Sequence, residues 1–302
     1  MDYVKFNLIN INHYKLINHS VLDFKGSYSK STGEINENVL VAEYHFCKIT
    51  IKNAQSENPY ILFTGSIHKL WNDLNGIKAP NYNEKEIYKG FNGNVFTLNN
   101  IIEIRSHLEN LFDCKASQMI FQNIEFGVNI NLTLNPKFFL KGLLHHRGIY
   151  FEFKHTRNYA QAKLKNWRFK IYNKKFQYKM IENILRVEVH SNKMTDIDST
   201  GIKTFADINK NTLDKASDLL LKRFDETMHY DYSIDKKKLT KRELEAIKNY
   251  SNPSYWIEDL KPNHRDRHKT KLKEITNSHS KKIHQIIKVK IKEMCVTINQ
   301  HF

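Results

Sequence analysis

Three short segments of the sequence carry side chains that suit phosphodiester chemistry, at the spacing of β-strands. Side chains along a strand alternate between the two faces of a sheet, so each segment has one apolar and one polar face. The polar faces of residues 123–130, 169–174 and 185–190 carry Glu125, then Lys170, Tyr172 and Lys174, then Arg186, Glu188 and His190. If these strands share a sheet, its polar face combines two carboxylates, a phenol, an imidazole and several cations.

The two carboxylates, Glu125 and Glu188, are candidate metal ligands. Carboxylate oxygens are hard donors that suit Mg²⁺ or Mn²⁺. Such a cation can polarise a phosphate oxygen and neutralise the charge that develops during an in-line displacement. We therefore expect a divalent metal, Mg or Mn, as the cofactor. A single glutamate in an alternating strand usually faces solvent, and this simpler interpretation stays open for each residue.

Tyr172 is the candidate nucleophile. A phenol has a reference pKa near ~10, so it needs help to attack phosphorus at neutral pH. Ammonium groups at Lys170 and Lys174 would favour the phenolate and could hold the scissile phosphate. Tyrosine also favours strands for packing reasons alone. Tyr178 shares the register if the strand continues and Tyr159 lies upstream, so spacing alone gives Tyr172 only a modest advantage.

Histidines and basic residues supply the remaining candidates. His68, within Gly65–Lys69, and His190 are candidate metal ligands or general acids, although a single histidine is more often structural. The candidate contacts to DNA are Lys69, Arg168, Lys170, Arg186 and His190. The sequence has no His-apolar-His triplet and no phosphate loop ending in Gly-Lys-Ser/Thr, so we do not expect ATP hydrolysis.

The net charge points to a polyanionic partner. The chain has 302 residues, 40% of them apolar, with 48 Lys and Arg against 32 Asp and Glu, which gives a formal charge of +16. Such an excess attracts nucleic acid through counterion release and long-range steering. Lysine enrichment through AT-rich coding is the alternative explanation. No basic amphipathic helix is evident at the N-terminus, so we expect no membrane partner.

Cysteine usage and hydropathy indicate a reducing compartment. Cys47, Cys114 and Cys295 are odd in number and widely spaced, which fits neither a disulfide framework nor a paired-cysteine zinc site. No apolar run reaches the ~18 residues of a spanning helix, and residues 1–6 lack the features of a signal peptide. We therefore expect a cytoplasmic protein.

Composition changes near residue 200 and predicts an α+β protein with a helical C-terminal region. Before this point we expect strands at 4–11, 39–52 and 60–68, a DNA-contacting loop at 72–93, a helix at 97–112 and a strand at 118–130. After it we expect helices at 213–224, after the capping box at 240–243, and at 283–294, with Tyr255–Trp256 as an aromatic anchor.

Several motifs, in this order, resemble those of rolling-circle replication initiation proteins, particularly the gene II type of filamentous phages and the related initiators of Bacteroidetes plasmids and small phages. They read Gly-Ser-Ile-His-Lys at 65–69, Ile-Glu-Phe-Gly-Val-Asn-Ile at 124–130, Ile-Tyr-Asn-Lys at 171–174, Leu-Arg-Val-Glu at 185–188 and Asn-Pro-Ser-Tyr-Trp at 252–256. Two features depart from the family pattern. Asn173 stands where relatives often have Asp, and the His-apolar-His triplet is missing.

The resemblance implies an architecture and roles for individual residues. Residues 1–200 would form a nicking and joining domain around an antiparallel-rich sheet, and residues 201–302 a helical region for DNA binding or partner recruitment. Tyr172 would be the nucleophile, assisted by Lys174. Glu125 and Glu188 would bind the metal, and His68 is the candidate third ligand.

The implied activity is that of a site-specific DNA endonuclease and strand transferase. It would nick origin DNA in a single-stranded or hairpin form, become linked to the 5′ phosphate, and release a 3′-hydroxyl for a host polymerase, with a host helicase as a further partner. Reversal of the reaction would rejoin the strand at termination, in the cytoplasm of a bacterial host. A non-catalytic origin-binding or repressor protein is the rival class, and an RNA-processing nuclease is a third.

Overall fold

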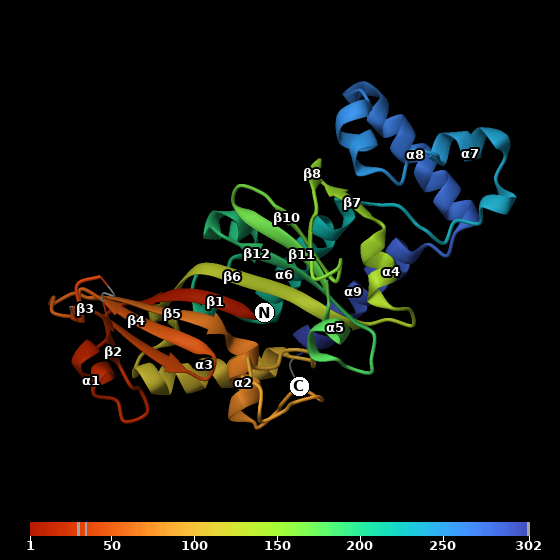
Figure 1. The fold of residues 1–302 in the computed structure, drawn as a ribbon. Coiled ribbons are helices and arrows are strands. Elements are labelled where there is room, and N and C mark those ends of the chain that lie inside the picture. Colours follow the sequence, from red (N-terminus) through yellow and green to blue (C-terminus); the bar gives the residue numbers. More distant parts are fainter. Residues whose placement is uncertain (29–30, 34, 301–302) are drawn as a thin grey trace. The chain divides into compact units, whose positions relative to one another are not determined.

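A computed structural model describes residues 1–28, 31–33 and 35–300, which divide into two compact units (Figure 1). Unit 1 contains residues 1–127, 190–216 and the chain from Val296 onward, and unit 2 contains residues 128–189 and 217–295. Each unit thus holds residues from both sides of residue 200, unlike the expected division at that point. The elements that run from one unit into the other are β6 (Met119–Asn131), β12 (Ile184–Ser191), α6 (Lys210–Asp225) and α9 (Ile283–Asn299).

Unit 1 is built on a sheet with the strand order β2-β3-β4-β5-β1-β6. All neighbouring pairs in this order are antiparallel. The elements are β1 (Tyr3–Leu8), α1 (His13–Ile17), β2 (Lys25–Tyr28), β3 (Ile35–Tyr44), β4 (Cys47–Lys52), β5 (Tyr60–Ser66), α2 (Ile67–Leu74) and α3 (Leu98–Phe112). The expected helix at 97–112 and strand at 118–130 are therefore present.

Two of the expected strands have different limits because turn and cap residues interrupt them. The predicted strand at 39–52 is a hairpin, with His45 and Phe46 in the left-handed region at φ 44° and 64°. Positive φ at both central residues is the requirement of the tight turn that matches strand twist. The predicted strand at 60–68 ends at Ser66, whose side chain accepts a hydrogen bond from Lys69 N and begins helix α2.

An aromatic core holds helix α3 against one face of this sheet. Phe6 of β1 stacks on Phe63 of β5 with ring centroids 4.7 Å apart. Its ring also meets Phe112 of α3 edge-on at 6.4 Å. Each fully buried phenylalanine contributes about 1.5–3 kcal/mol of transfer free energy, so these contacts fix β1 and hence the position of its first residues.

Unit 2 contains a second run of strands and a small separate sheet. The run continues from the end of β6 in the order β12-β11-β10-β9, and the small sheet has the order β13-β7-β8. The elements are α4 (Pro136–Lys141), β7 (Leu143–His146), β8 (Ile149–Tyr150), β9 (Glu152–Lys154), β10 (Tyr159–Lys163), β11 (Trp167–Asn173), α5 (Lys174–Tyr178) and β13 (Thr227–His229). The apolar face of β11 and β12 is fully buried, at Phe169, Ile171, Leu185, Val187 and Val189.

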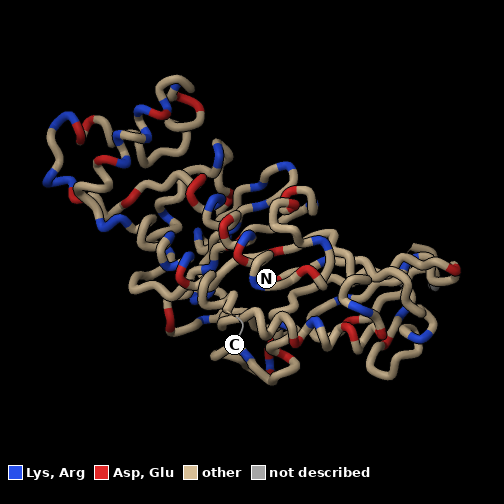
Figure 2. The backbone as a smooth tube through the Cα atoms, turned by 180° about the vertical axis from the view of Figure 1, so that it is seen from behind, with Lys and Arg blue, Asp and Glu red and all other residues tan. Residues whose placement is uncertain are grey.

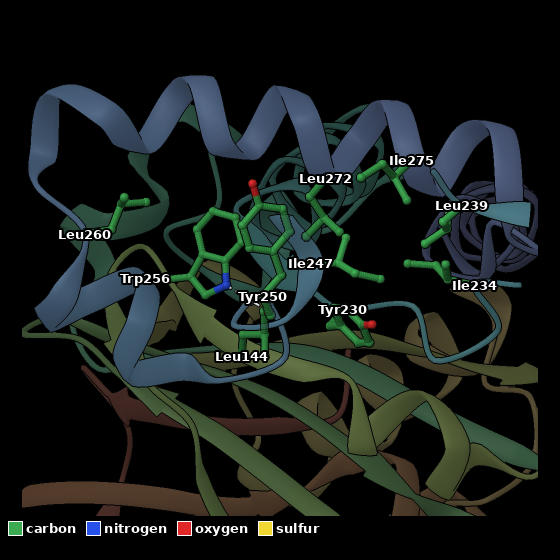
Figure 3. Packing of buried hydrophobic residues seen from close by; sticks show 10 residues of the cluster. All are labelled: Leu144, Tyr230, Ile234, Leu239, Ile247, Tyr250, Trp256, Leu260, Leu272 and Ile275. Atoms are coloured by element: carbon green, nitrogen blue, oxygen red, sulfur yellow. Dashed lines mark hydrogen bonds between the residues drawn. The ribbon is translucent and has the colours of Figure 1, made fainter. Parts of the chain in front are cut away.

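The C-terminal part of unit 2 folds around a cluster of its own (Figure 3). Helices α7 (Lys241–Ile247) and α8 (Pro262–His279) supply part of it, and Trp256 and Tyr250 are its largest members. The predicted capping box at Thr240 and Glu243 begins α7 as expected. Trp256 is the predicted anchor, and its indole N–H donates to Tyr250 O at 2.9 Å.

These elements confirm an α+β fold with a large antiparallel sheet and C-terminal helices. Helix α8 was not expected from the sequence, because only Leu272 and Ile275 are buried along its length. In the part of the chain that the structure describes, no helix is both long enough and apolar enough to span a bilayer.

Candidate active site

A bulge in strand β6 sets the direction of Glu125. Phe121 is buried in the first part of the strand, whereas Ile124 and Phe126 are buried after it. The pairing with β1 shifts register between these positions. An extra residue in one strand exchanges its two faces. Glu125 therefore lies on the face opposite Ile124 and Phe126, as the alternation over 124–130 predicts.

In unit 1, Glu125 lies in a buried polar group that we call the Glu125 cluster: Asp2, Glu125 and His190. Glu125 is 6% exposed, so it does not simply face solvent. His190 Nδ1 donates to Glu125 Oε2 at 3.0 Å, which fixes the imidazole orientation. Asp2 N donates to Glu125 O at 2.8 Å and extends the ladder between β1 and β6.

Asp2 is a site residue that the sequence analysis did not select. Its Oδ1 accepts a hydrogen bond from Ser66 Oγ, and its Oδ2 accepts one from Asn92 Nδ2 at 2.6 Å. Carboxylate oxygens of Asp2 and Glu125 lie within 4.8 Å of each other. The sequence did contain a signal, because Asp2 lies two residues before Val4, the first core residue of β1, and so has the alternation of a buried position. Burying a carboxylate costs free energy unless hydrogen bonds or ion pairs compensate it.

His68 and Lys69 lie on helix α2 and not on a strand. His68 is buried, its Nε2 shares a hydrogen bond with Asn94 Oδ1 at 2.7 Å, and its ring stacks on Phe96. Lys69 Nζ donates to Lys89 O at 2.5 Å. Burial lowers the pKa of Lys69, against the opposing effect of the Asp2 carboxylate. The structure thus brings Asp2 to Glu125 and directs His68 Nε2 toward the loop after α2.

Amide side chains fix the ends of the loop that we expected at 72–93. Asn72 belongs to α2 and is fully buried, and its Nδ2 donates to Phe91 O at 2.8 Å. Asn94 Nδ2 donates in turn to Asn72 Oδ1 at 2.9 Å. The irregular segment therefore starts after Leu74 and is anchored at both ends.

In unit 2, four residues of β11 and β12 form what we call the Glu188 cluster: Lys170, Tyr172, Arg186 and Glu188. Lys170 Nζ donates to Glu188 Oε1 at 2.6 Å, and Tyr172 Oη donates to Oε2 at 3.2 Å. Arg186 Nε donates to the same Oε2, and its NH1 group reaches Asn129 Oδ1 at 3.1 Å. The predicted polar face thus unites these four residues, and Glu188 is only 1% exposed.

Lys174 lies beside this cluster but belongs to a helix and not to the predicted strand. Strand β11 ends at Asn173, so Lys174 is the first residue of helix α5 and not a member of the strand face. The side chain is fully buried, with Nζ 5.0 Å from the ring centroid of Tyr172 and 5.1 Å from that of Tyr178. Tyr178 likewise lies on α5, so its expected place on the strand register is wrong. The ammonium group still lies beside the Tyr172 ring.

The side chain of Asn173 makes two hydrogen bonds at the end of strand β11. Its Oδ1 accepts a hydrogen bond from Phe176 N at 3.1 Å and caps helix α5. Its Nδ2 donates to Asn158 Oδ1 at 2.9 Å. An aspartate could serve as the cap but could not donate to Asn158. This protein therefore uses the amide to tie the end of β11 to the loop before β10.

The remaining predicted DNA contact, Arg168, lies on the same face of β11 as Lys170 and Tyr172. Its Cα pairs with that of Lys163 on β10. Further along this pair of strands, the rings of Tyr159 and Tyr172 lie 5.5 Å apart. The face that carries Tyr172 is thus extended by basic and aromatic side chains.

No protein-family model, no curated protein and no solved structure matches this chain. The geometry of the two clusters therefore carries the functional argument. Asp2 and Glu125 offer hard oxygen donors, which suit Mg²⁺ or Mn²⁺ better than soft metals. The Glu188 cluster holds a phenol beside a carboxylate and two cations, and Lys174 adds a third cation next to the Tyr172 ring. This arrangement suits attack on a phosphodiester.

Proposed function

We propose that this protein is a metal-dependent DNA endonuclease and strand transferase with a tyrosine nucleophile, which starts rolling-circle replication of a phage or plasmid genome. The observation that carries the proposal is the hydrogen bond from Tyr172 Oη to Glu188 Oε2, flanked by Lys170, Arg186 and Lys174. A phenol placed against a base and among cations is the arrangement that nucleophilic attack by tyrosine requires. The order of the motifs, which resembles that of rolling-circle initiators, supports the biological role.

The residues present suit a hard divalent cation. We propose Asp2 and Glu125, whose carboxylate oxygens lie within 4.8 Å of each other, as ligands of this cation, with the His190 imidazole fixing Glu125. Glu188, the other carboxylate expected as a ligand, already bonds Lys170 and Arg186, and we propose it as the acceptor of the Tyr172 proton. When bound, such a cation neutralises charge on the phosphate oxygens.

In the proposed reaction Tyr172 attacks the phosphorus of one phosphodiester bond. The Tyr172 O–P bond forms as the bond from phosphorus to the 3′ oxygen breaks. Glu188 Oε2 takes the phenolic proton, and the departing 3′ oxygen takes a proton from water to become the free hydroxyl. Lys170 and Arg186 lie where they can hold the phosphate. Attack of a 3′-hydroxyl on the phosphotyrosine reverses these steps and rejoins the strand.

The test compares wild type with Tyr172→Phe on a labelled single-stranded oligonucleotide from the replicon's origin, in Mn²⁺. Wild type should form a covalent protein–DNA adduct. Tyr172→Phe should lower its yield by about a thousandfold or more, as removal of a nucleophile commonly does. Tyr159→Phe is the matched control, because it removes the hydroxyl of the neighbouring ring. Equal adduct yields from wild type and Tyr172→Phe would exclude Tyr172 as the nucleophile.

One observation favours a non-catalytic origin-binding or repressor protein as the second candidate. Glu188 already bonds Lys170 and Arg186, so the cluster could be a neutralised structural network. This candidate predicts specific binding to the origin without strand breakage. Conversion of supercoiled replicon DNA to open circles, abolished by EDTA, separates the two functions.

A further inference from the structure

Unit 2 has a cavity of about 660 Å³ outside the Glu188 cluster, walled by helix α4, the β9–β10 hairpin and the segment after α7. Its volume lies in the range of ligand-binding pockets. Three aromatic and three cationic side chains line it: Phe138, Phe153, Tyr232, Lys137, Lys141 and Arg157. Ser251 and Pro253, beside and within the Asn-Pro-Ser-Tyr-Trp motif, complete one wall.

The aromatic rings of this pocket are unusually accessible. Phe138 is 40% exposed and Tyr232 is 38% exposed. Two of the three rings have a cation beside them. Lys141 Nζ lies 4.4 Å from the Tyr232 ring centroid, and the Arg157 guanidinium lies 3.8 Å from that of Phe153. Aromatic surface left open beside cations is the arrangement that stacks nucleobases and contacts their phosphates.

The charge of the pocket is uncompensated. Its lining includes no acidic residue among those that the structure describes, and within the same described chain Lys137, Lys141 and Arg157 form no ion pair. All three side chains are exposed. A positive, concave surface of this kind concentrates field lines and attracts anionic ligands.

The hairpin that carries Arg157 is held in an unfavourable conformation. His155, Thr156 and Arg157 are consecutive non-glycine residues in the left-handed region, at φ 51°, 50° and 63°. Such residues each cost on the order of 1–3 kcal/mol and cluster at ligand-binding sites. The turn places the guanidinium over Phe153.

We propose that this pocket binds single-stranded DNA, with a base stacked among Phe138, Phe153 and Tyr232 and the backbone phosphates on Lys137, Lys141 and Arg157. Duplex DNA is a poorer ligand, because its bases stack on one another and do not reach the rings. The choice of DNA as the ligand rests on the proposed function. The binding itself needs neither Tyr172 nor a metal.

The β9–β10 hairpin connects the pocket to the strand that pairs with Tyr172. Phe153 belongs to β9 and lies on the sheet face opposite Tyr172, because its Cα pairs with that of Ala160. The turn after β9 leads into Tyr159, whose Cα pairs with that of Tyr172. Unpaired DNA held in the pocket would therefore pass around the β9–β10 hairpin to reach Tyr172.

The experiment measures binding of fluorescein-labelled oligo-dT, in EDTA, to the full chain carrying Tyr172→Phe. Phe138→Ala in this background should weaken binding by about 5- to 150-fold, the range for loss of one stacked base. Lys137→Ala with Lys141→Ala should lower the slope of log K against log salt by about 0.7 per lost phosphate contact. A duplex of the same oligonucleotide should bind more weakly and be insensitive to Phe138→Ala.

Two matched variants control for exposure and net charge. Tyr14→Ala removes an exposed aromatic ring of unit 1, and Lys48→Ala with Lys52→Ala removes two exposed lysines of strand β4. Unchanged oligo-dT binding by Phe138→Ala, or equal loss of duplex binding, overturns the proposal. Preferential binding of oligo-U over oligo-dT shows that the ligand is RNA and also overturns it. A failure of nicking leaves these binding results unaffected, so the two proposals fail separately.

Discussion

Lysine and arginine occur in two different environments in unit 2. In the Glu188 cluster, Arg186 is buried, Lys170 is largely buried with 14% of its side chain exposed, and each donates to the buried Glu188 carboxylate. Between Lys236 and Lys282, by contrast, the sequence has 14 Lys and Arg against 6 Asp and Glu. Figure 2 shows such positions recurring along α7 and α8. This basic segment supplies most of the small apolar cluster of Figure 3, which Leu144, Tyr230 and Ile234 complete.

The surroundings of the charges decide what each region can do. An ion pair in the interior is weakly screened, so the position of each atom matters. Exposed charges are screened within about 8–10 Å at physiological salt and hold no fixed geometry. The Glu188 cluster is therefore suited to directing one proton and one phosphate. The basic segment is suited to attracting a polyanion of any sequence.

The largest effect on stability should come from breaking the buried network. Glu188→Leu leaves Lys170 and Arg186 without their carboxylate, and removing one partner of a buried ion pair costs about 3–5 kcal/mol. Denaturant unfolding followed by circular dichroism measures the loss. Glu245→Leu is the matched change in the basic segment, where the carboxylate is 79% exposed and its pair with Lys248 contributes about 0–1 kcal/mol. Similar losses for the two variants would contradict the distinction between the regions.

The next largest effect should appear on acidification and depend on a buried histidine. Burial, followed by the nearby Arg223 and Arg147, lowers the pKa of His146 from 6.5 to about 3. Below pH 6.5 the unfolded chain therefore binds a proton that the folded chain excludes, and stability falls as the pH drops toward about 3. Between pH 6.5 and pH 5 this group should account for about 2 kcal/mol. Unfolding of His146→Phe across this range should show a shallower pH slope.

His264 provides the comparison for this experiment, because it is exposed on α8 in the basic segment. His264→Phe makes the same change of imidazole to phenyl at an exposed position. A slope for His146→Phe equal to that of wild type would show that its imidazole does not resist protonation. The carboxylate of Glu226 lies 3.8 Å from His146 Nε2 and would favour the charged form of the imidazole.

The polar faces of β6 and β12 could be predicted from sequence because alternation is a local property. Glu125 and Glu188 lie where the period of two places them. Lys174 does not, because a side-chain cap at Asn173 ends strand β11 one residue earlier than the apolar pattern indicates. Asp2 was missed because its one signal, the parity that it shares with Val4, comes from a single residue before the strand. Its role depends on Ser66 and a distant loop, which only the folded chain brings together.

Helix α8 could not be predicted from the sequence, for a different reason. Its sequence is charged around most of its circumference, so the 3.6-residue period that predicts a helix is nearly absent. Its two buried residues, Leu272 and Ile275, pack into the cluster of Figure 3, and His268 shares a hydrogen bond with Tyr250 Oη at 2.8 Å. Its position is therefore set by tertiary packing around Trp256. The charged side chains that hide its helical period from prediction are mostly exposed to solvent.

The smallest effect on stability should come from the basic segment itself, where Lys236 and Lys237 are exposed. Replacing both with alanine should change the unfolding free energy by less than about 0.5 kcal/mol, because surface substitutions rarely do more. If these lysines contact DNA, the slope of log K against log salt for duplex binding should fall by about 0.9 for each lost phosphate contact. The Tyr172 adduct yield at low salt should stay unchanged. A wild-type salt slope together with a reduced adduct yield would contradict this distinction between the two regions. The exposed lysines would then contribute to the reaction at Tyr172 and not to the attraction of DNA.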